Sequence, residues 1–135
     1  MKKLVTFLMM MIAILVGGET AKAYTFTTGK MYGAVGNYSV TMVLTVNTSS
    51  GRVSGWYYYD SKGSKNKIQL SGTMKGDPIN GASMTLTETV KGKKTGTFKG
   101  SFWLSPSGSE GYNGTWSSPS GKRLEFDVMH DVRGY

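Results

Sequence analysis

The stretch "GRVSGWYYYDSKG", Gly51 to Gly63, places four aromatic residues in a row between glycines. Successive side chains of a strand point to opposite faces, so the aromatic run divides into two pairs. We predict that Tyr57 and Tyr59 face the interior, while Trp56 and Tyr58 stand outside among polar neighbours. An exposed aromatic pair suits a contact surface, and it also suits cross-strand packing that stiffens a small sheet.

The rest of the chain repeats this form in short alternating segments, which are separated by glycine, serine and lysine. Turn sequences such as "SKGSKN", "KGKK" and "SPSGK" connect the segments and suit hairpins rather than crossover helices. The pattern predicts an all-β fold, a single antiparallel up-and-down meander of seven or eight strands that closes into a barrel or near-barrel. The expected strands are Met31 to Val35 (the eighth, in which alternation is weakest), Tyr38 to Val46, Val53 to Asp60, Lys67 to Met74, Ser83 to Val90, Thr95 to Leu104, Tyr112 to Ser117 and Arg123 to Met129.

Alternation also assigns an interior face to each strand. Glycines that fall within strands, such as Gly72 and Gly100, predict bends or close backbone approaches in a curved wall. The residues expected inside are Tyr38, Val40, Met42, Leu44, Val46, Ile68, Leu70, Met84, Leu86, Val90, Phe98, Phe102, Leu104, Leu124, Phe126 and Val128.

The amino-terminal segment has the three parts of a secretory signal peptide. Lys2 and Lys3 form a basic start, an apolar stretch of 13 residues follows, and Ala21 and Ala23 provide a small-x-small ending. We therefore expect residues 1–23 to be a signal peptide and residues 24–135 to be one exported β-barrel domain, periplasmic or extracellular. No second apolar stretch follows, so no transmembrane segment is expected after cleavage.

Composition sets limits on the mature domain. The chain has no cysteine, so disulfides and thiolate metal sites are excluded. Removal of residues 1–23 takes three lysines and one glutamate, so the formal net charge falls from +8 to +6. A basic protein favours anionic neighbours such as lipid headgroups, acidic polysaccharide or nucleic acid. The lysines are scattered among turns, however, which is also typical of an ordinary solvated surface.

Glu88 is the residue that breaks the alternation. In "SMTLTETV" it shares the interior parity of its apolar neighbours, so its carboxylate needs a partner or a wet position at the mouth of the barrel. Tyr57, Tyr59 and Arg123 are the candidate partners. A strand-end carboxylate that reaches solvent and a polar anchor at the mouth of a pocket both remain open.

Most catalytic signatures are missing. The sequence contains no glycine-rich phosphate loop, nucleophile elbow or paired zinc histidines. The only histidine, His130, lies beside Asp127 and Asp131 at positions that do not converge on a strand, so no metal site is expected. Besides Glu88, no second acid has a clear interior parity, which disfavours glycosidase chemistry. We expect no enzyme activity and no cofactor, and because the protein is expected to be exported, we expect no nucleic-acid partner.

The segments "VSGWYYYDSKG", "IQLSG", "MTLTE", "TGTFKGSF", "NGTW" and "LEFDV" together resemble small exported bacterial β-barrel domains of the lipocalin-like or avidin-like kind. This resemblance implies a non-catalytic binding protein that holds a small ligand or an anionic envelope partner at an open barrel end. An enzyme-inhibitor module that resembles lysozyme inhibitors is an alternative, although a basic chain is poorly matched to a basic enzyme. A structural envelope component is another. The candidate ligand-binding residues are Glu88, Tyr57, Tyr59, Trp56, Tyr58 and Arg123.

Overall fold

The computed structural model describes residues 24–131, which form nine strands and one turn of 3-10 helix. The predicted signal peptide, residues 1–23, and the last four residues lie outside the described part. Within residues 24–131, no helix has the length and apolar character needed to cross a membrane. The elements are β1 (Thr25–Thr27), β2 (Met31–Val35), β3 (Tyr38–Asn47), β4 (Arg52–Tyr59), β5 (Ile68–Lys75), η1 (Pro78–Asn80), β6 (Ala82–Val90), β7 (Lys93–Leu104), β8 (Glu110–Ser117) and β9 (Arg123–His130).

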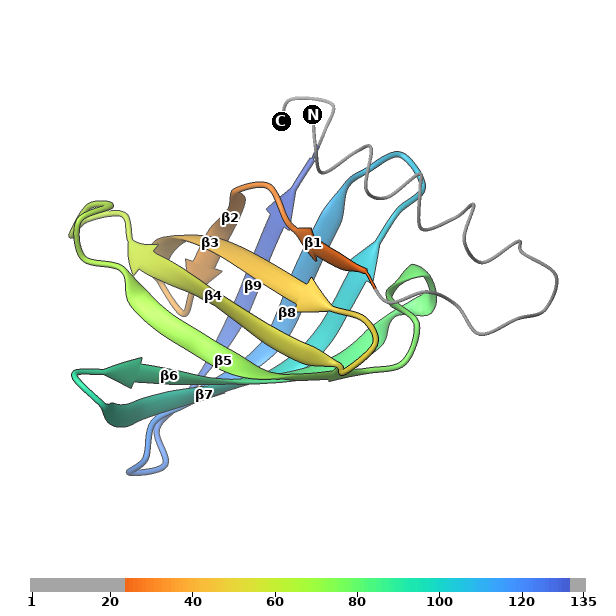
Figure 1. The fold of residues 1–135 in the computed structure, drawn as a ribbon. Coiled ribbons are helices and arrows are strands. Elements are labelled where there is room, and N and C mark those ends of the chain that lie inside the picture. The colour runs from red at the N-terminus through yellow and green to blue at the C-terminus, as the bar shows by residue number, and fades with distance from the viewer. Residues whose placement is uncertain (1–23, 132–135) are drawn as a thin grey trace, which may run out of the picture.

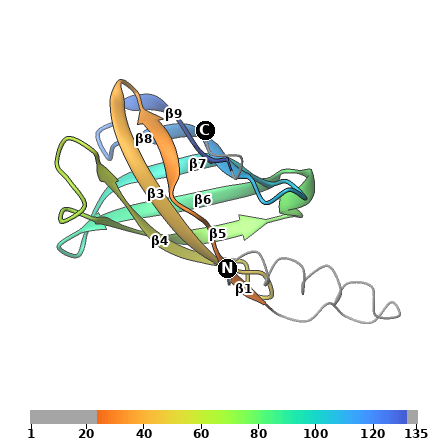
Figure 2. The same cartoon turned by 90° about the horizontal axis from the view of Figure 1, so that it is seen from above.

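Strands β2 to β9 form a closed antiparallel barrel (Figure 1, Figure 2). Each strand pairs with the next along the chain, and β9 returns to pair with β2, where Val35 lies opposite Phe126. The predicted up-and-down meander and its closure are therefore confirmed, including the eighth strand, which begins at Met31. Closure gives each of these eight strands a hydrogen-bonded partner on both sides, which removes the exposed edges of an open sheet.

Strand β1 is an addition that the sequence pattern did not predict. It pairs with the far end of β3, where Thr25 lies opposite Asn47, whereas β2 pairs with the first half of β3. Between the two, Thr28 continues the pairing, because its amide donates to the Leu44 carbonyl at 2.8 Å and its Oγ1 accepts from the Leu44 amide at 3.0 Å. Thus β1 and β2 act as one interrupted strand. Three residues carry too little alternation to reveal β1 in the sequence.

Aromatic rings pack the centre of the barrel. Phe98 makes edge-to-face contacts with Tyr57 and Phe126, with ring centroids 5.2 and 4.9 Å apart. Tyr112 packs against Phe126 at 4.7 Å, and its hydroxyl donates to the Met84 carbonyl at 3.0 Å. All of these rings are buried. The predicted interior parity is confirmed for Tyr57, and for Phe98 and Phe126 on their strands.

Paired glycines allow β7 and β8 to approach each other closely. Gly100 of β7 lies opposite Gly114 of β8, and a Cβ atom on Gly100 would stand 1.8 Å from the Asn113 carbonyl oxygen. No side chain fits there, so the wall can curve sharply at this pair. This agrees with the expected role of glycines within the strands.

The two ends of the barrel differ in how they are covered. At the end formed by the loops 48–51, 76–81 and 105–109, which we call the closed end, the inward residues are buried. Phe26 of β1 is only 6% exposed and stacks on Phe102 with centroids 6.3 Å apart, and Pro78 of η1 is buried. Strand β1 begins at this closed end, and β9 ends there (Figure 1).

The opposite end, formed by the loops 36–37, 60–67, 91–92 and 118–122, is the open end. Here Tyr38 is 56% and Val90 is 40% exposed, so their predicted interior burial is wrong. Both residues stand at the ends of their strands, where no further neighbour covers them. Tyr59, Ile68 and Leu124 are partly buried at the same end and pack against the core. The inward faces of the strands thus form an apolar rim, which we define as Tyr38, Tyr59, Ile68, Val90 and Leu124.

Candidate binding site at the open end of the barrel

Glu88 lies beneath the rim, on the inward face of β6. Its side chain is only 5% exposed, as expected from its parity with Leu86. Burial of a charged carboxylate costs free energy unless hydrogen bonds replace the lost water. The neighbours of Glu88 therefore decide whether this acid can be tolerated.

Three neutral donors satisfy the Glu88 carboxylate. Oε1 accepts from the Tyr57 hydroxyl and from the Trp116 indole Nε1, the latter at 3.1 Å. Oε2 accepts from Thr95 Oγ1 at 2.7 Å. Within residues 24–131 no lysine or arginine makes an ion pair with this carboxylate, so hydrogen bonding alone compensates its burial. The expectation of a tyrosine partner is confirmed for Tyr57.

Tyr59 extends this network toward the rim. Its hydroxyl lies 3.4 Å from the Tyr57 hydroxyl, and its ring meets Tyr38 edge-on with centroids 6.0 Å apart. Burial, followed by the hydrogen bond to Glu88, raises the pKa of Tyr57 well above the usual tyrosine value. Burial also raises the pKa of Tyr59. Both phenols therefore keep their protons at neutral pH, and a line of hydroxyl groups connects the buried carboxylate with the partly exposed end.

Thr95 reaches Glu88 because of a β-bulge. The pairing of β6 with β7 shifts after Glu88, which lies opposite Gly96, while Thr89 lies opposite Lys94. Thr95 is therefore the extra residue of β7 and is free of the regular alternation. By parity with Phe98 it would face outward, so the sequence pattern gave no signal for its contact with Glu88.

Trp116 is the second contact that sequence reasoning missed. It stands on β8, and β7 lies between it and Glu88 on β6. A Cβ atom on Gly96 would be 2.4 Å from Trp116 Nε1 and 2.9 Å from Glu88 Cδ. Because Gly96 has no side chain, the Trp116 indole can lie over β7 at this point and reach the Glu88 carboxylate. Trp116 shares the inward parity of Tyr112 on β8, and this was the signal in the sequence that it faces the interior.

The outer aromatic pair is a separate feature of β4. Trp56 and Tyr58 stack with centroids 5.9 Å apart and an interplanar angle of 12°. Lys67 Nζ lies 4.2 Å from the centroid of the Trp56 ring, a cation–π contact. Trp56 is partly exposed whereas Tyr57 is fully buried, which confirms the predicted assignment of faces. The wall of the barrel separates this pair from Glu88.

Arg123 does not join the Glu88 network. It is exposed on β9 opposite Ser117, and the next residue, Leu124, carries the inward parity. The structure therefore brings Glu88, Tyr57 and Tyr59 together and leaves Trp56, Tyr58 and Arg123 on the outer surface.

A second buried acid contradicts the prediction that Glu88 is the only one inside. Glu110, at the start of β8, is 2% exposed, and its Oε2 accepts from the Gly29 amide at 2.7 Å. Glu110 lies opposite His130 at the closed end, whereas Glu88 lies at the open end. The two carboxylates therefore do not face each other across one cleft.

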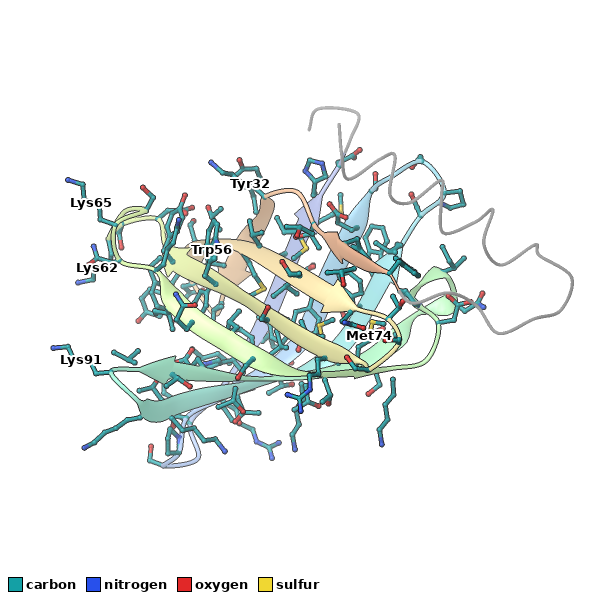
Figure 3. All side chains as sticks on the ribbon, viewed as in Figure 1. Tyr32, Trp56, Lys62, Lys65, Met74 and Lys91 are labelled. Atoms are coloured by element: carbon teal, nitrogen blue, oxygen red, sulfur yellow. The ribbon has the colours of Figure 1, made fainter. Side chains whose placement is uncertain are left out.

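Cations surround the open end. Residues 24–131 contain twelve lysines and arginines, and eight of these, all exposed, lie on or beside three hairpins of that end. Figure 3 shows Lys62, Lys65 and Lys91 projecting away from the barrel there, with Met74 near the other end. The eight cations, which we call the basic fringe, are Lys62, Lys65, Lys67, Lys91, Lys93, Lys94, Lys122 and Arg123.

The loops of the closed end offer a contrast. The stretches 48–51, 76–81 and 105–109, together with the two residues on either side of each, contain two cations, Arg52 and Lys75, and two acids, Asp77 and Glu110. The end of the barrel that is less covered is thus also the end that carries most of the cations. The apolar rim, the buried carboxylate of Glu88 and the basic fringe all lie at the open end. Comparisons with protein-family models, with curated proteins and with solved structures gave no match.

Proposed function

We propose that the protein is an exported, non-catalytic binding protein that holds a small ligand or an anionic envelope partner at the open end of the barrel. One observation carries this proposal. The inward-facing residues at the strand ends are buried at the closed end but partly exposed at the open end, above a buried and fully hydrogen-bonded carboxylate. Ligand sites commonly combine an apolar lining with a few placed polar groups.

The arrangement favours a particular ligand chemistry. The rim supplies apolar and aromatic contacts through Tyr59, Ile68 and Leu124. Glu88 accepts a hydrogen bond from the Tyr57 hydroxyl and so fixes its orientation. The Tyr57 hydroxyl in turn lies 3.4 Å from the Tyr59 hydroxyl. The basic fringe attracts negative charge to the same end. A ligand with an apolar body above Glu88 and an anionic group directed outward to the basic fringe therefore fits best. This agrees with end-on binding by the lipocalin-like and avidin-like barrels that the sequence resembles.

Export rests on the segment that ends at Ala23. Mass spectrometry of the protein recovered outside the cytoplasm should give the mass of a chain that begins at Tyr24. A recovered mass that includes residues 1–23 would contradict signal cleavage at this position.

Ligand binding is tested with Glu88→Gln. A thermal-shift screen of small amphipathic anions against the wild-type protein identifies a binder, and its affinity is then measured for the variant by calorimetry. The amide retains the shape and part of the hydrogen bonding, so the variant should fold. Loss of the charge-assisted bonds that order the site should weaken binding about tenfold or more.

The matched control is Glu125→Gln, which removes the same charge from an exposed position on β9. Its affinity should equal that of the wild type. A screen without any binder, or equal weakening in both variants, would overturn the proposal of a ligand site above Glu88.

A further inference from the structure

We propose that the open end docks end-on onto an anionic phospholipid bilayer, with the basic fringe in the headgroup region and the exposed part of the rim at the interface. This inference rests on the proposed function, since it names the anionic envelope partner. Three observations support it: the cations gather at one end, exposed apolar residues lie among them, and the rings of the outer aromatic pair are covered by each other and by Lys67.

The cations are placed to act together. In a meander, alternate hairpins share one end, and here the loops 60–67, 91–92 and 118–122 bring the basic fringe together from β4 to β9. The charged residue of opposite sign in these loops is Asp60, whose Oδ1 accepts from Thr41 Oγ1 at 2.7 Å. Each lysine or arginine near an anionic leaflet strengthens binding about fivefold. Eight exposed cations on one end are therefore enough for reversible docking.

Apolar residues lie among these cations. Val90, 40% exposed, directly precedes Lys91 at a hairpin tip, and Tyr38, 56% exposed, stands beside the turn at 36–37. Amphipathic surfaces of this composition insert their apolar groups at the boundary between headgroups and acyl chains while the cations meet the phosphates. Tyrosine is favoured in that region because one side of it is apolar and its hydroxyl is polar.

The same surface is less suited to an acidic polysaccharide. Sugar rings stack on open aromatic faces, but Lys67 lies over the Trp56 ring and Tyr58 stacks beside it. The open end thus offers charge together with two exposed rim residues, Val90 and Tyr38. A bilayer uses both, whereas a polysaccharide would use the charge alone.

The experiment is vesicle co-sedimentation of residues 24–135. Vesicles of phosphatidylcholine alone are compared with vesicles that also contain phosphatidylglycerol, at about 0.1 M salt and again at about 1 M salt, where the Debye length is only about 3 Å. We expect binding to the anionic vesicles at low salt, with loss at high salt and little binding to phosphatidylcholine. Equal binding to both lipid compositions, or none to either, would overturn the inference without requiring any variant.

Paired variants locate the surface. Lys62→Gln with Lys65→Gln removes two cations from the open end, and Arg52→Gln with Lys75→Gln removes two from the closed end. All four side chains are exposed, so the folds should survive, which circular dichroism checks. The open-end pair should weaken partitioning about tenfold or more, and the closed-end pair should change it much less. Equal effects would mean that net charge alone drives binding, which contradicts end-on docking.

Val90→Ser separates the bilayer from a polysaccharide. The variant keeps every charge but removes an exposed apolar group, so it should weaken binding to anionic vesicles while leaving binding to soluble polygalacturonate unchanged. Tighter binding to polygalacturonate than to vesicles, with no effect of Val90→Ser on either, would refute the lipid assignment. Glu88→Gln should still bind vesicles, so failure of docking and failure of the small-ligand site give different results.

Discussion

Trp116 donates its indole hydrogen to Glu88 Oε1 at 3.1 Å, and the bond passes over a strand to which neither residue belongs. Trp116 stands on β8, Glu88 on β6, and the intervening strand β7 contributes Gly96 at the crossing point. The polar network of the open end therefore depends on a residue without a side chain.

Gly96→Ala should break this contact. The added methyl group would lie 2.4 Å from Trp116 Nε1, so the indole must move and Glu88 loses a donor. We expect a loss of about 1 to 3 kcal/mol in the free energy of unfolding, measured by urea denaturation. Faster solvent exchange of the Trp116 indole hydrogen, followed by nuclear magnetic resonance, should accompany it.

Gly111→Ala is the matched control for Gly96→Ala. Its methyl group would meet the Trp103 ring at 2.5 Å, so it also displaces an indole, but one that does not touch Glu88. This variant should leave the exchange rate at Trp116 unchanged. Equal acceleration at Trp116 in both variants would show that general strain, rather than the crossing at Gly96, controls the indole.

Glu88→Leu should destabilise the barrel although it adds apolar surface. The substitution leaves Tyr57, Trp116 and Thr95 without their common acceptor. We expect a cost on the order of 1 to 3 kcal/mol in urea denaturation, and a smaller cost for Glu88→Gln, which keeps an acceptor oxygen. A leucine variant as stable as the wild type would show that the network contributes nothing to folding.

Alkaline pH should destabilise the protein through its buried tyrosines. Burial raises the pKa of Tyr112 far above the value of about 10 expected in the unfolded chain. The stability that comes from keeping Tyr112 protonated in the folded state is fully present below pH about 10. Above it the unfolded state loses a proton that the folded state keeps, so stability falls by about 1.4 kcal/mol per pH unit for each such group.

Tyr112→Phe tests this dependence, because it removes the titrating group while keeping the ring. Urea denaturation at several values between pH 9 and about 11 should give a shallower decline for the variant than for the wild type. Parallel declines would mean that Tyr112 does not contribute to the alkaline instability.

Phe26→Ala should destabilise the closed end. The ring is 6% exposed and stacks on Phe102, so its removal leaves a cavity and uncovers the core. We expect a loss of about 3 kcal/mol in calorimetry or urea denaturation. Tyr32→Ala removes an aromatic ring from the exposed outer wall of β2 and should change stability by no more than about 0.5 kcal/mol. Similar losses in the two variants would contradict the role of Phe26 as a cover.

The alternation of side chains and the short turn sequences together were sufficient to predict the barrel. Alternation also predicted the inward position of Glu88, because period-two patterns report directly on the two faces of a strand. The partners of Glu88 were harder to predict. Thr95 contacts it through a bulge, and an inserted residue leaves no trace in a parity count. Trp116 crosses a strand, which requires knowledge of the lateral packing at Gly96.

The basic fringe illustrates a different limit. In the sequence, Lys62, Lys91 and Lys122 are about 30 residues apart and look like ordinary turn lysines. Only the meander topology, in which alternate hairpins return to the same end, brings them together. The covering of the closed end was also missed, since it depends on Phe26 in a strand of three residues.

The described chain both enters and leaves the barrel at the closed end, through β1 and β9. An affinity tag, a fluorescent reporter or a solid support joined at either end of residues 24–131 would therefore be attached on the side opposite the rim. Immobilised in this way, the domain presents Glu88 and its surroundings to the solution, so surface-based binding measurements on tethered protein should report on the open end without obstruction.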